Sequence, residues 1–76
     1  MASESTLELS ADESLVLFEW LYRYLEVESH TFADEAEEIV LCRVLGMLES
    51  RLTEPFAPDY RALVTAARAR IRAPGE

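Results

Sequence analysis

The chain contains no lysine, one cysteine and one histidine among its 76 residues. A lone cysteine excludes an internal disulfide, and one cysteine with one histidine cannot supply the four ligands of a structural zinc site. The sequence also carries no readable catalytic or cofactor motif. We therefore expect a protein that is not an enzyme and that holds neither a metal nor another cofactor.

Long hydrophobic runs are also missing. The longest uncharged apolar runs span four residues, at 15–18 and 39–42, whereas a membrane-spanning helix needs about 20. The N-terminal residues lack a basic region ahead of an apolar run, which a secretory signal would have. Together with the unpaired thiol, these absences predict a cytoplasmic protein that does not associate with membranes.

What the chain has in excess is negative charge. It carries 15 acidic residues against seven arginines, for a formal net charge of −8. Because nucleic-acid affinity comes largely from cationic side chains that release counterions, we expect no direct nucleic-acid binding. The charge is uneven: residues 58–76 hold four arginines and two acids, whereas residues 1–57 hold three arginines and thirteen acids. A protein of this charge favours basic partners.

Helical periodicity predicts one small all-α domain over residues 1–76. Two helices form a hairpin and a third packs across it, with expected ranges of about 11–28, 33–53 and 58–72. Residues 6–10 alternate polar and apolar side chains, as in a short strand or an extended coil. Coil is favoured, because no second alternating segment could pair with a strand. Residues 1–9 and 73–76 are expected to be flexible.

Local signals set the helix boundaries. Ser10 and Glu13 match a capping box, in which each side chain bonds the backbone amide of the other residue. Thr31 or Phe32 is expected at the N-cap of the second helix. Two prolines within residues 54–58 end that helix and suit the first turn of the third.

The first helix is too apolar for a single buried face. Its hydrophobic side chains cover roughly 260° of the circumference, whereas a surface helix normally shows one apolar stripe. One face is matched by leucines of the second helix: Leu17, Phe18, Leu21 and Leu25 against Leu41, Leu45, Leu48 and Leu52. The other face consists of Val16, Trp20, Tyr24 and Val27. Either the third helix covers it or another protein does; its aromatic residues make it the candidate protein interface.

The charged residues allow more than one interpretation. Three acids spaced by seven residues form a line on the first helix: Asp12, Glu19 and Glu26. A solvated face is favoured over a phosphate-like display that blocks a basic groove. Three arginines fall within about 40° of one another on the third helix: Arg61, Arg68 and Arg72. Pairing with acids, inside one molecule or across a dimer, is favoured over contact with an acidic partner or nucleic acid.

A structural rather than a functional role is expected for three residues, His30, Cys42 and Gly46. His30 lies in the polar connection between the first two helices and is expected to be exposed. Cys42 is expected to be a small, half-buried packing residue rather than a reactive thiol. Gly46 costs about 1 kcal/mol relative to alanine inside a helix, so we expect another helix or an aromatic ring to approach it closely.

Two segments, residues 10–21 and 54–60, resemble a family of uncharacterised small acidic helical proteins of bacteria. The resemblance covers most of residues 7–72. It implies no activity and brings no site residues, so the functional expectation depends on the residues themselves.

The expected function is non-catalytic protein interaction. A chain this short buries only about 60% of the surface of its unfolded form, so without a disulfide or metal it needs an oligomeric contact or an unusually apolar core. We expect a small acidic partner such as an antitoxin, immunity protein or accessory subunit, binding another protein or a second copy of itself. The alternative is a nucleic-acid-mimicking inhibitor that blocks the basic groove of a nucleic-acid-binding protein.

Overall fold

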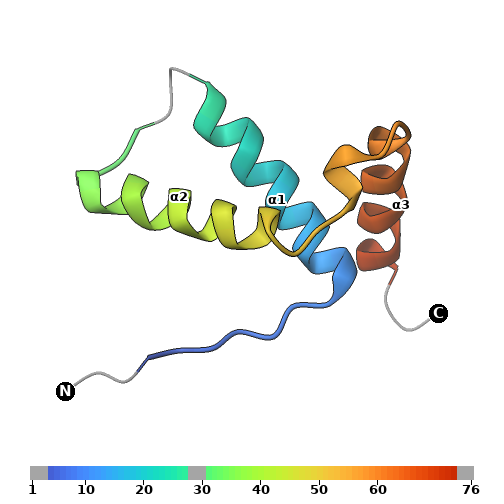
Figure 1. Cartoon of the computed structure of the whole chain (residues 1–76), viewed down its shortest axis with the longest axis horizontal. Helices are drawn as coiled ribbons and strands as arrows, with labels where there is room; N and C mark the ends of the chain where they lie inside the picture. Colours follow the sequence, from blue (N-terminus) through green and yellow to red (C-terminus); the bar gives the residue numbers. More distant parts are fainter. Residues whose placement is uncertain (1–3, 28–30, 74–76) are drawn as a thin grey trace.

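The computed structural model describes residues 4–27 and 31–73. Within these ranges it contains three α-helices and one short 3-10 helix: α1 (Ala11–Glu26), α2 (Glu35–Glu49), η1 (Glu54–Phe56) and α3 (Tyr60–Arg72). The expected all-α, three-helix fold is confirmed, and the lead-in of residues 4–10 has no regular secondary structure. Figure 1 shows α1 in the middle of the molecule, with α3 beside its first half and α2 approaching it from the other side.

The start of α1 follows the predicted capping box. The backbone amide of Glu13 donates to the Ser10 hydroxyl at 3.0 Å, and the backbone amide of Ser10 donates to the Glu13 carboxylate at 2.8 Å. The helix ends at Glu26, where Val27 adopts extended backbone. The capping box and the helix dipole together therefore fix the residue at which α1 begins.

The boundaries of α2 differ from the expectation. Asp34 is the N-cap in place of Thr31 or Phe32, and its carboxylate accepts a hydrogen bond from the amide of Ala36 at 2.7 Å. The helix stops at residue 49, short of the expected 53. At that end the Ser50 hydroxyl donates to the carbonyl of Met47 at 2.8 Å. A serine that bonds a nearby carbonyl competes with continuation of the helix.

Two apolar clusters hold the helices together. On the α3 side, Leu15 packs with Val64 and Ala67, which are all at most 3% exposed. On the α2 side, Phe18 and Leu21 pack with Leu48. The expected leucine face does point at α1: Leu41 and Leu45 of α2 are half-buried there, and so is Leu52, which follows the end of α2. Both α2 and α3 therefore bury their core residues against α1.

The first half of α2 contributes little to this core. Leu48 is the buried residue of α2, and every residue from 33 to 40 is exposed. Figure 1 shows the reason. The C-terminal end of α2 lies beside α1, whereas the N-terminal end of α2 lies farther from α1. Cys42 is exposed, so the expectation of a half-buried thiol is wrong. The expected close neighbour of Gly46 is also missing from the described chain, because a Cβ atom there would meet nothing within 4 Å.

The divergence of the helices leaves an unusually large surface. The chain exposes 6256 Å², whereas a compact monomer of 8.6 kDa exposes about 4,700 Å². Its Cα radius of gyration is 14.1 Å, against about 11 Å for a compact domain of this length. The extended residues 4–10 and the exposed residues 33–40 both contribute to this surface.

Candidate functional site

The polar side of α1 faces α3 rather than solvent. The Arg70 guanidinium donates two hydrogen bonds to Asp12, at 2.8 and 2.9 Å. The Tyr60 hydroxyl donates to a Glu19 oxygen at 2.7 Å, and Arg23 lies 3.7 Å from the other oxygen of that carboxylate. Asp12 and Glu19 are consequently half-buried contacts with α3. The expectation that they belong to a solvated face is wrong for both.

These contacts shift the ionisation of the groups involved. The hydrogen bond from Arg70 lowers the pKa of Asp12 below its ordinary value of 3.8, and Asp12 in turn raises the pKa of Arg70. Burial raises the pKa of the Tyr60 hydroxyl well above its ordinary value of 10.0, and the hydrogen bond to Glu19 raises it further. Tyr60 therefore stays protonated and acts as a donor to Glu19 throughout the physiological pH range.

Because α3 lies over the polar side of α1, it leaves part of the predicted interface uncovered. Trp20 is 44% exposed, and its ring stacks on that of Tyr24 at a centroid distance of 4.9 Å. Phe32 meets the Tyr24 ring edge-on at 5.9 Å, and the Tyr24 hydroxyl donates to the Thr31 carbonyl at 3.2 Å. We call Trp20, Tyr24 and Phe32 the aromatic row.

The structure separates the other two predicted interface residues from this row. Val16 is half-buried and packs against the cluster of Leu15, Val64 and Ala67, so α3 does cover that residue. Val27 forms the C-cap of α1 and is 44% exposed. Of the four predicted residues, Trp20 and Tyr24 are therefore brought together, whereas Val16 joins the core.

A second exposed apolar region was not anticipated from the sequence. A groove of about 700 Å³ lies between the C-terminal half of α1, the end of α2 and η1; the apolar side chains along it are Phe18, Tyr22, Val27, Pro55, Phe56 and Tyr60. Phe56 is 77% exposed and Tyr22 is 48% exposed. We call this region the η1 groove. Pro55 and Pro58 were the available signal, because proline interrupts regular helices and is frequent in surface turns.

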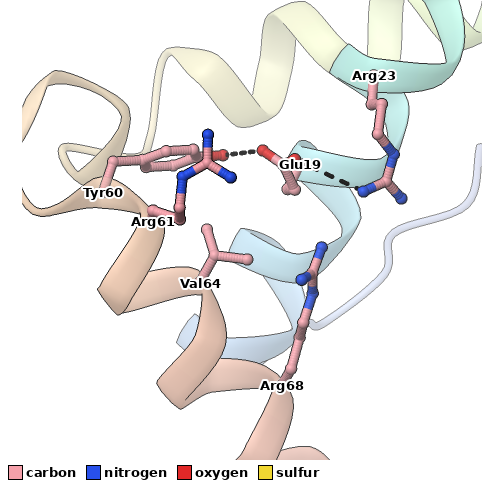
Figure 2. A pocket seen from close by; sticks show the side chains of 6 residues that line it. All are labelled: Glu19, Arg23, Tyr60, Arg61, Val64 and Arg68. Atoms are coloured by element: carbon pink, nitrogen blue, oxygen red, sulfur yellow. Dashed lines mark hydrogen bonds and ion pairs between the residues drawn. The ribbon is translucent and has the colours of Figure 1, made fainter.

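The third feature is a basic pocket in an acidic protein. A cavity of about 340 Å³ opens between α1 and α3, and its lining residues are Glu19, Arg23, Tyr60, Arg61, Val64 and Arg68. Figure 2 shows the three arginine side chains arranged around Glu19 and Val64. We call this cavity the arginine pocket. Arg61 and Arg68 of the predicted stripe thus share one site, whereas Arg72 lies outside its lining and the paired arginine is Arg70.

Two further searches concern the described part of the chain. Across residues 4–27 and 31–73, no three His, Cys, Asp or Glu side chains are grouped so that they could hold a metal ion. Nor does any helix in these ranges have the length and apolarity that crossing a membrane requires. His30 lies outside the described residues.

No family model, no curated protein and no solved structure matches the chain. What the chain does must therefore be inferred from its own surface chemistry.

Proposed function

We propose that this chain is a non-catalytic interaction module that buries its exposed apolar surface against another protein, in the simplest case a second copy of itself. The observation that supports the proposal is the set of exposed large apolar side chains on the packed helices, among them Trp20, Val40 and Met47, together with the exposure of every residue from 33 to 40. A standard interface buries about 800 Å² on each partner, and exposed large apolar side chains of this kind are typical of its core.

The chemistry of this surface fits an interface. Large apolar side chains on α1, at its end, on α2 and on η1 are more than two-fifths exposed: Trp20, Tyr22, Val27, Ile39, Val40, Met47 and Phe56. Aromatic residues and methionine are enriched at interface cores, and tryptophan and tyrosine are frequent among the residues that dominate binding energy. A helix that is apolar on several sides is normally covered on more than one of them.

A second copy is the simplest occupant, because a two-fold dimer presents the same patch on both partners. The uncovered first half of α2 is a helix face that another helix can pack against. Two chains of net charge −8 repel each other, so added salt should strengthen self-association. A basic partner would show the opposite dependence, as expected for an antitoxin, immunity protein or accessory subunit that is steered by charge.

The experiment that tests the proposal is sedimentation of the full chain at micromolar concentration, in low and in high salt. We expect a dimer that tightens with salt and that Trp20→Ala weakens. Ile71→Ala is the matched control, since Ile71 is 40% exposed on α3 and belongs to neither exposed region of α1.

Three outcomes are informative. A dimer that Trp20→Ala and Ile71→Ala weaken equally would place the interface elsewhere. A monomer in both salts, with a tryptophan emission that does not change with concentration, would overturn self-association. Capture of a basic nucleic-acid-binding protein that salt abolishes and Trp20→Ala spares would favour the nucleic-acid mimic instead.

A further inference from the structure

We propose that the arginine pocket between α1 and α3 is a binding site for a dianionic phosphate group. The inference goes beyond the proposed interaction function. Trp20 and Tyr24 do not line this pocket, whereas Glu19, Arg23 and Tyr60 line both the pocket and the adjoining η1 groove.

The first argument is the local charge. Three of the seven arginines of the chain line this one cavity, and Glu19 is the acid among its lining residues. The lining therefore carries three positive charges and one negative charge, a sum of +2, in a protein whose net charge is −8. Like charges held together repel, so an arrangement of this kind is stabilised when an anion occupies it.

The second argument is the geometry. Arg61 and Arg68 are seven residues apart, which is two helical turns and places them on the same side of α3. Arg23 comes from α1, on the opposite wall. Figure 2 shows the guanidinium group of Arg61 beside Tyr60, that of Arg68 near Val64, and that of Arg23 on the other side of Glu19, with which it is paired.

The third argument is that two of these arginines keep their donors available. Within the described ranges, neither Arg61 nor Arg68 forms an ion pair or donates a side-chain hydrogen bond to the protein. Arg70 shows the contrast, because both of its bonds to Asp12 are short and well directed. The paired Arg70 fixes α3 on α1 and Arg23 is paired with Glu19, whereas the donors of Arg61 and Arg68 remain available to a ligand.

The chemistry of the ligand follows from these donors. Guanidinium groups match the oxygens of phosphate and carboxylate, and a dianion balances the charge of +2 better than a single carboxylate does. The Tyr60 hydroxyl already donates its hydrogen bond to Glu19, so it offers no donor to an anion and the arginines must supply the donors. The Glu19 carboxylate keeps the ligand on the side of Arg61 and Arg68. The cavity of about 340 Å³ also has room for the first atoms of a molecule that carries the phosphate.

The test is an NMR titration of the full chain with inorganic phosphate at constant ionic strength, followed on the backbone amides and the arginine Nε–H groups. We expect the Nε–H signals of Arg61 and Arg68 to shift and to saturate, while the paired Arg70 does not follow. Arg61→Gln and Arg68→Gln should each weaken binding about tenfold, the effect of one charge-assisted hydrogen bond. Arg51→Gln is the control, because Arg51 is exposed and lies outside the pocket.

A variant of opposite sign sharpens the test. Glu19→Gln keeps an oxygen that can accept from Tyr60 and removes the negative charge, so it should tighten phosphate binding about threefold. Phosphoserine in place of inorganic phosphate distinguishes the sources: tighter binding indicates a monoester, equal binding indicates free phosphate, and both support the site.

Three results would overturn the proposal. The first is shifts that rise linearly for all arginines without saturation. The second is equal weakening by Arg51→Gln and Arg61→Gln. The third is acetate binding as tightly as phosphate, since this would identify a site for a single carboxylate. Arg61 is exposed, so its variant folds even where the half-buried Arg68 is needed for packing. Sedimentation reports on self-association separately, so failure of one proposal leaves the other standing.

Discussion

The two helices that pack on α1 do so in opposite ways. α3 is rich in arginine and alanine, yet it buries Val64 and Ala67 and is fixed by two polar contacts, Asp12 with Arg70 and Glu19 with Tyr60. α2 carries many more large apolar residues, yet Leu48 is its buried residue and the helix diverges from α1. The comparison shows that apolar content does not decide which helix is better covered. Directional contacts place α3, whereas α2 leaves apolar side chains exposed.

The largest expected effect is a loss of unfolding free energy from core substitutions, which compares how firmly α3 and α2 are held on α1. Leu15→Ala, on the α3 side, should lower the free energy of unfolding by about 3 kcal/mol, because the cavity is enclosed by two fixed helices. Leu48→Ala, on the α2 side, should cost less, about 2 kcal/mol, because α2 can shift to close the space. Urea unfolding followed by circular dichroism at low protein concentration measures both. An equal or larger loss for Leu48→Ala would show that α2 is as firmly held as α3.

A smaller effect of opposite sign is expected at Gly46. Nothing lies within 4 Å of a Cβ atom added there, so Gly46→Ala should stabilise the monomer by about 1 kcal/mol through helix propensity. Ala69→Gly, at an exposed position of α3, is the mirror control and should cost a similar amount. Thermal unfolding gives both values. If Gly46→Ala stabilises the monomer but weakens the dimer, a second copy approaches α2 at this residue; a destabilised monomer would contradict the open surroundings of Gly46.

The smallest effect concerns the pH dependence of the α3 contact. Since Arg70 lowers the pKa of Asp12, the pair contributes stability above the unfolded-state pKa, and that contribution is lost as the pH falls through the lowered pKa. Asp12→Asn should therefore have a lower Tm than the unmodified chain at neutral pH, and the two should converge on the acid side of 3.8. Asp59→Asn is the control, because the Asp59 side chain makes no capping bond. A Tm difference that persists in acid would mean that packing, and not charge, is responsible.

Much of the fold could be predicted from local signals. The capping box at Ser10 and the leucine face opposite α1 are short-range patterns, and both were found where the sequence indicated. The prolines near Phe56 do interrupt the chain between the helices, but α2 already ends at Glu49 and Pro58 precedes the first turn of α3. The length of α2 was overestimated. Serine occurs at several positions of the chain, so the sequence alone does not indicate that the hydroxyl of Ser50 bonds the Met47 carbonyl.

The sites were harder to predict, because they depend on which side of α1 the third helix takes. The hydrophobic periodicity of α1 favoured packing of α3 on an apolar face of α1. In the structure α3 packs instead on the side of α1 that carries Asp12 and Glu19. This packing covers Val16, exposes Trp20 and brings Arg23 to face Arg61 and Arg68. No pattern in one helix reveals a pairing that needs a partner 41 or 58 residues away.

The exposed position of Cys42 has a practical consequence. The chain has one tryptophan and one thiol, on α1 and α2 respectively, so the native sequence already contains a fluorescence donor and a unique attachment point for an acceptor dye. Energy transfer from Trp20 to a dye on Cys42 reports the separation of the two helices without any engineered label site. The distance between α1 and α2 can thus be followed in real time as protein concentration or salt is changed.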